Sequence, residues 1–163
     1  YKGLLDFGVL FQPADLTKYD YVNLPEKDAW GVITRKDSPL AAKRSIARQD
    51  LLGEPLLLSR QAIRRSTAKN EFLEWFKDDF EKMDVVGTFN LVYNAAILAE
   101  AGLGHIVSLD GLVNTTESGT LCFRLLEPRL ETGLNIVWKK YQVFSPAAEV
   151  FLKRIQERFG GTQ

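Results

Sequence analysis

Two apolar runs in this sequence lead directly into residues that hydrogen-bond or stack. Residues 55–58 are followed by Ser59, Arg60 and Gln61, and residues 85–86 by Thr88, Phe89 and Asn90. If each run is a strand that feeds a helix, hydroxyl groups and unpaired backbone N–H groups gather where the strand ends. Such groups suit a carboxylate or phosphate. Both segments are therefore candidate contacts for a small anionic metabolite, with Phe89 as an aromatic wall.

A third loop follows the first apolar run of the chain, and it consists of Phe11, Gln12 and Pro13. We expect it to face the other two segments across a cleft. The alternative for every residue in the three segments is a purely structural role as a helix cap or turn. Ser59 and Asn90 are the strongest candidates for ligand contact, and Pro13 is the weakest.

Other reactive residue types favour structural roles. Arg60, Arg64, Arg65 and Lys69 form a basic cluster that suits an anion, but a solvated helix face accounts for it more simply, and only Arg60 is kept as a site candidate. The acidic residues between 71 and 81 have no nearby histidine, so a metal or acid-base pair is not expected. His105 has no metal-ligand spacing around it, and Cys122 lies in an apolar run.

No sequence motif for catalysis occurs in the chain. It lacks a Walker loop, G-x-G-x-x-G, G-x-S-x-G and H-E-x-x-H, and its single histidine leaves little general-base chemistry. We therefore expect neither an enzyme nor a bound metal or cofactor.

The elements that position the candidate residues form a strand-helix-strand unit over residues 84–113. The strand at 85–86 leads into a helix that either Thr88 or Asn90 caps and Gly102 ends, and a second strand contains Ile106 and Val107. A parallel β-α-β crossover is the economical interpretation. Its first loop would lie at the carboxyl edge of the sheet, where open α/β folds bind ligands.

The rest of the chain predicts further strands and helices. We expect separate strands at 19–24 and 30–34, strands at 121–126 and 133–141, and a long amphipathic helix directly after Gln61. Trp75, Phe76 and Phe80 on that helix are expected in the core or on a dimer surface. A C-terminal helix begins at Ser145-Pro146 and turns Val150, Phe151, Ile155 and Phe159 inward.

Composition narrows the functional class. The 163 residues are 45% hydrophobic and 26% charged, as in a globular protein. Twenty-one basic and twenty-one acidic residues give zero net charge, which argues against direct nucleic-acid binding. No membrane span or signal peptide is evident, and a single cysteine favours a reducing compartment, so we expect a cytoplasmic protein.

Five blocks occur in an order that resembles one known family. They are LDFGVL, KDSPLA, DLLGEPLLLSRQ, FNLVYNAAILAEAGLGHIVSL and LNIVWKKYQVFSPAAEVFLKRI, and together they cover almost the whole chain. This order is similar to that of the effector-binding domain of LysR-type transcriptional regulators. Each block alone is weak, but their shared order and spacing are specific.

The resemblance implies an α/β fold of the type 2 periplasmic-binding-protein class, with two Rossmann-like lobes joined by two crossing strands. By similarity, residues 1–34 and 137–163 belong to lobe 1, and residues 35–136 form lobe 2. The first strand needs neighbours that precede it, so we expect lobe 1 to be truncated at its N-terminus. The family's winged helix-turn-helix would be absent from this chain.

The function implied is that of an inducer-sensing domain. A small anionic effector would bind between the lobes and shift the population of conformations that control DNA binding by the missing N-terminal domain. The family's domains form antiparallel homodimers, and the intact regulators form tetramers. The alternative is an exported solute-binding protein of the same fold.

Overall fold

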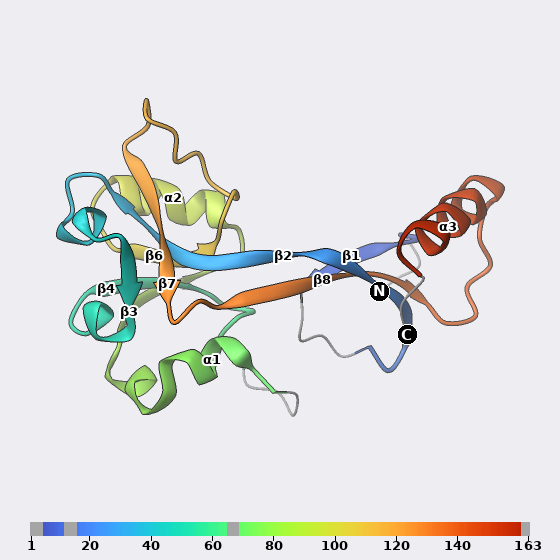
Figure 1. Ribbon diagram of the computed structural model, residues 1–163, viewed down its shortest axis with the longest axis horizontal. Helices are drawn as coiled ribbons and strands as arrows, with labels where there is room; N and C mark the ends of the chain where they lie inside the picture. The colour runs from blue at the N-terminus through green and yellow to red at the C-terminus, as the bar shows by residue number, and fades with distance from the viewer. Residues whose placement is uncertain (1–4, 12–15, 65–68, 161–163) are drawn as a thin grey trace. The chain divides into compact units, whose positions relative to one another are not determined.

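A computed structural model describes residues 5–11, 16–64 and 69–160, and Figure 1 shows its helices and strands. The chain divides into two compact units. Unit 1 comprises Tyr1–Asp28 and Thr132–Gln163, and unit 2 comprises Ala29–Glu131. The lobe boundaries predicted from the sequence, after residues 34 and 136, lie a few residues further along the chain.

Unit 2 is built on a mixed β-sheet. Its strand order is β3-β7-β2-β6-β4-β5. The strands are β3 (Ser45–Ala47), β4 (Pro55–Ser59), β5 (Asp84–Phe89), β6 (His105–Leu109), β7 (Leu121–Glu127) and the second half of β2 (Tyr19–Arg35). Strands β5 and β6 both run parallel to β4, whereas β2 is antiparallel to β6 and β7. The carboxyl ends of β4, β5 and β6 therefore meet at one edge of the sheet.

Helix α2 (Val92–Glu100) joins β5 to β6, which confirms the predicted parallel crossover. Strand β4 lies between the two strands that the helix connects. The helix ends as expected, because Gly102 takes a φ of +80° and the Leu103 N–H donates to Leu98 O at 3.0 Å. Only glycine adopts this left-handed backbone without strain.

Both faces of the unit 2 sheet are covered, which explains its nearly continuous apolar runs. Side chains alternate along each strand, so Leu56 and Leu58 pack into one core cluster and Leu57 into the other. The first cluster lies against Phe72 and Phe76, and the second lies against the alanines of α2. In Figure 1, α1 and α2 lie on opposite sides of this sheet. Each fully buried leucine contributes about 1.5–3 kcal/mol to folding.

The helix expected directly after Gln61 begins later than predicted. Helix α1 covers Glu71–Phe76 and continues as the 3₁₀ helix η3 (Lys77–Lys82). The Asn70 side chain caps it by accepting from Leu73 N at 3.1 Å. Residues 60–63 form a turn instead of a first helical turn. Trp75 and Phe76 are buried and Phe80 packs against the same core, so their alternative placement on a dimer surface is wrong.

Two further 3₁₀ helices precede β4. Helix η1 (Pro39–Ala42) is capped by Ser38, whose Oγ accepts from Leu40 N at 3.2 Å. Helix η2 (Arg48–Leu51) follows β3 directly. None of the helices in the described ranges is long and apolar enough to span a membrane.

Unit 1 contains β1 (Gly8–Phe11), β8 (Glu131–Lys139), the first half of β2 and the C-terminal helix α3 (Pro146–Phe159). Strand β1 pairs antiparallel with β8. Helix α3 begins as predicted, with Ser145 Oγ accepting from Ala148 N at 3.3 Å. Ile155 packs with Val22 and Trp138, but Val150 and Phe151 are exposed, so their predicted burial is wrong.

The two strands predicted at 19–24 and 30–34 are one. Strand β2 runs without interruption from Tyr19 to Arg35 and therefore passes from unit 1 into unit 2. Its burial pattern changes along the way. The unit 1 half is largely exposed, whereas Gly31 to Thr34 are buried in the middle of the unit 2 sheet.

Candidate functional site

The carboxyl edge of unit 2 brings two of the predicted segments together. Strands β4 and β5 are adjacent and parallel, and Ser59 is the register partner of Phe89. The Arg60 N–H donates to Phe89 O at 2.9 Å. The segment 59–61 therefore lies directly beside the segment 88–90, as expected from two parallel strands that end at the same edge.

Residues 59–64 form a tight hydrogen-bonded turn. The Ser59 Oγ accepts from Ala62 N at 3.5 Å, and the Ser59 carbonyl accepts from Ile63 N at 3.2 Å. Among the described residues, the Gln61 N–H has no hydrogen-bond acceptor. The side chains of Arg60 and Gln61 are exposed. This turn thus presents a cation, an amide and a free backbone donor without the helix N-terminus that we expected.

The second predicted segment, residues 88–90, does not cap helix α2. Thr88 and Phe89 are the last residues of β5, and Asn90 lies in the bend that follows. The N-cap residue of α2 is Leu91, with no side-chain hydrogen bond, so the predicted capping by Thr88 or Asn90 is wrong. Phe89 is half-buried against the core under α2, whereas Thr88 and Asn90 are exposed. Their polar side chains are therefore available to a ligand.

The same edge includes residues that sequence reasoning missed. The carboxyl end of β6 leads into Asp110, whose N–H donates to Ala29 O at 2.9 Å. Trp30 pairs with Leu109 and packs against Phe72 with the two rings tilted at 45° and their centroids 4.6 Å apart. The signal available in the sequence was the dipeptide Asp110-Gly111 directly after a β-branched strand, the same arrangement that drew attention to Ser59.

The third predicted segment belongs to unit 1. Phe11 is the last residue of β1, is half-buried and pairs with Leu134. Gln12 and Pro13 lie outside the described residues. Their predicted contact with a ligand therefore stays a prediction.

Several charged residues of unit 2 form ion pairs, and the basic cluster is not the helix face that we predicted, because Arg60 lies in a turn and Arg64 and Lys69 lie before α1. Lys69 lies 3.3 Å from Glu74, and Asp79 lies 2.8 Å from both Lys82 and Arg48. Lys82 chiefly, with Arg48, lowers the pKa of the Asp79 carboxyl by stabilising its charged form. Arg65 lies outside the described residues. No group of three potential metal ligands occurs in the described part of the chain.

His105 is held in a structural pair of contacts. Its Nδ1 lies 2.7 Å from Thr34 Oγ1, and its Nε2 lies 3.1 Å from Glu54 Oε2. Thr34 is fully buried, so its hydroxyl group cannot contact a substrate. Cys122 is a buried free thiol. Both residues therefore have the structural roles that the sequence indicated.

The sequence and the fold have counterparts among known proteins. Residues 1–160 match the family described as the LysR substrate binding domain. This chain belongs to that family. Its LysR domain is 30% identical over 149 residues to the HTH-type transcriptional regulator YbhD of Escherichia coli (strain K12), covering 90% of this chain but only 45% of YbhD. The chain thus spans less than half the length of that relative.

Solved structures show that the LysR domain has the type 2 periplasmic-binding-protein-like fold. The regulatory domain of CcmR from Synechocystis PCC6803, solved in complex with 2-PG, matches with a TM-score of 0.67 and 18% identity, covering 96% of this chain and 74% of that one. The effector-binding domain of QuiR in complex with shikimate matches with a TM-score of 0.70 and 14% identity, covering 95% of this chain and 72% of that one.

Proposed function

We propose that this LysR domain senses a small anionic effector through the edge formed by β4 and β5. The observation that carries the proposal is the pairing of Ser59 with Phe89, which gathers exposed polar side chains and a free N–H of Gln61 on adjacent strand ends. The Arg60 side chain supplies a positive charge next to these donors. A carboxylate or phosphate group is complementary to such a set.

The proposed contacts are those predicted from the sequence. In unit 2 they are Ser59, Arg60, Gln61, Thr88, Phe89 and Asn90. Phe11, Gln12 and Pro13 are proposed as the unit 1 contribution. The bound molecules in the CcmR and QuiR domains support a small-molecule ligand for a domain of this fold.

Effector binding would regulate transcription through a DNA-binding part of the whole protein. Support comes from YbhD, an HTH-type transcriptional regulator of which this chain matches less than half. We infer that the chain itself contacts no DNA or membrane, performs no catalysis and works in the cytoplasm. The effector acts by binding one conformation of the domain more tightly than another, and coupling of about 1–3 kcal/mol is sufficient.

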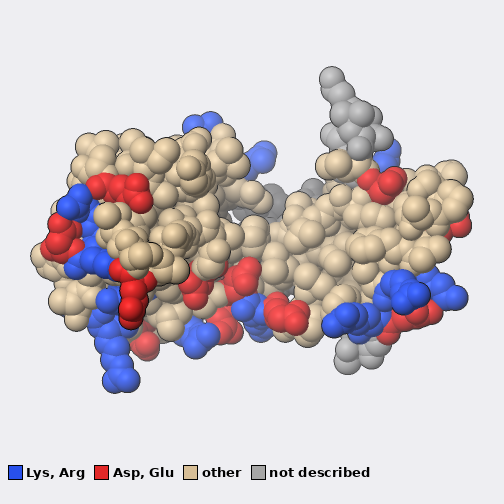
Figure 2. Space-filling model, turned by 90° about the horizontal axis from the view of Figure 1, so that it is seen from above, with Lys and Arg blue, Asp and Glu red and all other residues tan. Residues whose placement is uncertain are grey.

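The match to a regulator family disfavours the alternative of a solute-binding protein for transport. We also propose that the domain forms a homodimer, with a tetramer for the intact regulator. Helix α2 and the edge strand β5 present the surface for it, because Tyr93, Ile97 and Val86 are 74%, 55% and 51% exposed. Figure 2 views the molecule from the side on which α2 lies in Figure 1, and much of the unit 2 surface there carries no charge.

The test starts from a thermal-shift screen of anionic metabolites on the domain. For a compound that raises the melting temperature, Ser59→Ala and Asn90→Ala should each weaken binding about tenfold, since each removes a hydrogen bond to a charged group. Isothermal titration calorimetry measures the change. Neither substitution should alter the melting temperature of the free domain much, because Ser59 Oγ makes only one long hydrogen bond within the described ranges.

Ser118→Ala is the matched control, since Ser118 is exposed in a loop of unit 2 away from both segments. It should bind the compound as the parent does. Equal losses of stability and of binding in the Ser59 and Asn90 variants would reduce both residues to structural roles and contradict the proposed site.

A further inference from the structure

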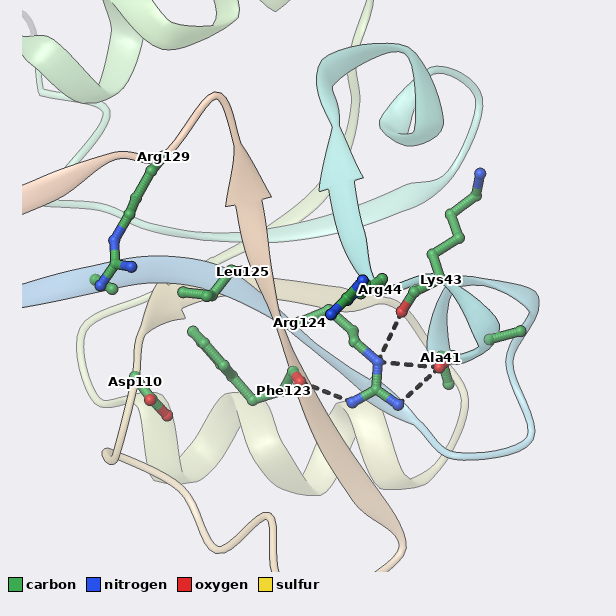
Figure 3. Close-up of a pocket in the computed structure, with 10 residues that line it drawn as sticks. Ala41, Lys43, Arg44, Asp110, Phe123, Arg124, Leu125 and Arg129 are labelled. Atoms are coloured by element: carbon green, nitrogen blue, oxygen red, sulfur yellow. Dashed lines mark hydrogen bonds between the residues drawn. The ribbon is translucent and has the colours of Figure 1, made fainter.

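A hollow lies in unit 2 beside β7. Its volume is about 660 Å³, which is within the range of small-molecule sites. None of the proposed effector contacts lines it. Figure 3 shows the residues around it, which come from β7, β2 and η1, from the segment between η1 and β3, and from the loops at Asp110 and Arg129.

The floor of the hollow is apolar. The Phe123 ring lies directly over Gly31, where an added Cβ would come within 2.2 Å of the ring. The absence of a side chain at Gly31 therefore lets the Phe123 ring approach the strand closely. Leu125 and the small side chains of Ala29 and Ala41 continue this floor. An aromatic or aliphatic group can lie there with little loss of hydrogen bonding.

Arg124 forms one wall of the hollow, and no acidic side chain of the described residues neutralises its positive charge there. Its guanidinium donates to Ala41 O at 3.0 and 2.7 Å, to Lys43 O at 2.9 Å and to Phe123 O at 2.8 Å, as the dashed lines in Figure 3 show. All these acceptors are neutral carbonyls, so no carboxylate compensates the positive charge. The contacts also tie the segment that carries Lys43 and Arg44 to β7.

The rim has an excess of positive charge. Lys43, Arg44, Arg124 and Arg129 line the hollow with one acid, Asp110, a difference of three positive charges. Lys43 and Arg129 have partners outside this lining, Asp50 at 2.9 Å and Glu131 at 2.7 Å. Within the described part of the chain, Arg44 forms no ion pair or hydrogen bond. Its guanidinium is thus the cation most available to an anion.

We propose that this hollow is a second binding site, for a small organic acid with an apolar body. The carboxylate pairs with Arg44, and the body of the ligand lies on Phe123 and Leu125. A purely inorganic anion would leave the apolar floor uncovered, and a neutral apolar ligand would leave Arg44 unpaired. This site shares no residue with the proposed effector contacts at β4 and β5. An experiment can therefore contradict one of the two sites without contradicting the other.

The test uses 4-bromobenzoate as the probe, with the neutral 4-bromobenzamide for comparison. Isothermal titration calorimetry on the 163-residue chain should show binding of the acid with a Kd of about 1 mM or tighter, and at least about tenfold weaker binding of the amide. Arg44→Glu should weaken binding of the acid by about tenfold or more, because it replaces the pairing cation with a repelling anion.

The matched control is Arg154→Glu, the same change of charge at an exposed residue of α3 in unit 1. It should leave binding unchanged. Crystals soaked with the acid should place the bromine, located by its anomalous signal, over Phe123. Absence of binding, undiminished binding by Arg44→Glu, or a bromine located at Ser59 and Asn90 instead would overturn the second site. The last result would leave the proposed effector site standing.

Discussion

The Asp50 carboxylate connects the segment before β3 to the 3₁₀ helix after it. It accepts from Ala47 N at 2.8 Å and lies 2.9 Å from Lys43 Nζ, and its side chain is 21% exposed. The hydrogen bond from Lys43, together with that from the Ala47 amide, lowers the pKa of Asp50 despite some desolvation. Folding therefore favours the ionised form of this group.

Asp50→Asn should lower the free energy of unfolding at pH 7 by about 1 kcal/mol, since the amide cannot form the charged pair. A group whose pKa falls on folding contributes stability above its unfolded value, near 3.9, and loses it as the pH falls through the lower folded value. The difference between parent and variant should therefore shrink as the pH falls below the unfolded value. Urea unfolding between pH 2.5 and 7 measures it, and a difference that stays constant with pH would contradict the assigned role.

The candidate site was predictable from the sequence to the level of segments. Ser59 and Asn90 each follow an apolar run, and parallel pairing of β4 and β5 was enough to bring them together. Their local roles were not predictable, because an exposed Asn or Ser beside a helix start suits a cap equally well. Only the backbone shows that Leu91 occupies the N-cap position of α2.

At the scale of elements, β2 shows that hydrogen bonding to neighbouring strands can override the preference of individual residues for a turn. Pro25 and Asp28 lie between its two apolar parts and favour a turn, which led to the prediction of two strands. Both are nevertheless within one strand, because β2 has hydrogen-bonded neighbours along its length, β8 first and then β6 and β7. The sequence contains no local signal of those partners.

Helix α1 was misplaced for a related reason. The apolar spacing of Phe72, Phe76 and Phe80 is helical, but the same spacing gives no starting residue. Asn70 supplies the start and also donates from Nδ2 to Ala62 O at 2.8 Å. This side chain therefore connects the helix cap to the turn that follows Ser59.

Asn70→Ala should cost about 2 kcal/mol of stability, about half from the cap and half from the bond to Ala62. Asn70→Asp keeps the capping oxygen and should cost less. Hydrogen exchange should show faster exchange at the Ile63 and Arg64 amides in both variants, since both lose the donor to the turn.

Ser145→Ala is the matched cap variant on α3 in unit 1. It should cost about 1 kcal/mol and leave exchange in the turn unchanged. If Asn70→Ala and Asn70→Asp were equally stable, the loss of stability would not divide between the helix cap and the hydrogen bond to Ala62, and this account would be contradicted.

At the scale of the whole molecule, self-association is the property most open to test. The exposed apolar side chains of α2 and β5 form the proposed dimer surface, and apolar side chains of this size gain about 25 cal/mol per Å² when a partner covers them. A charge placed in the middle of such a surface loses its hydration on association without a partner.

Ile97→Asp should therefore convert a dimer to a monomer at micromolar concentration, as measured by sedimentation velocity. The comparison variant is Val143→Asp, also an exposed aliphatic residue but in unit 1. It should sediment as the parent does. A parent that is monomeric at every concentration, or an Ile97→Asp variant that remains dimeric, would contradict the proposed surface.

The central claim is that a small molecule binds at the carboxyl ends of β4 and β5. The most direct measurement is a ¹H–¹⁵N NMR titration with the compound that the thermal-shift screen selects. Our account predicts that the largest amide shifts occur at residues 59–62 and 88–91, with the Gln61 amide among them. Saturable binding that leaves these amides unmoved, while residues elsewhere in the chain shift, would contradict it.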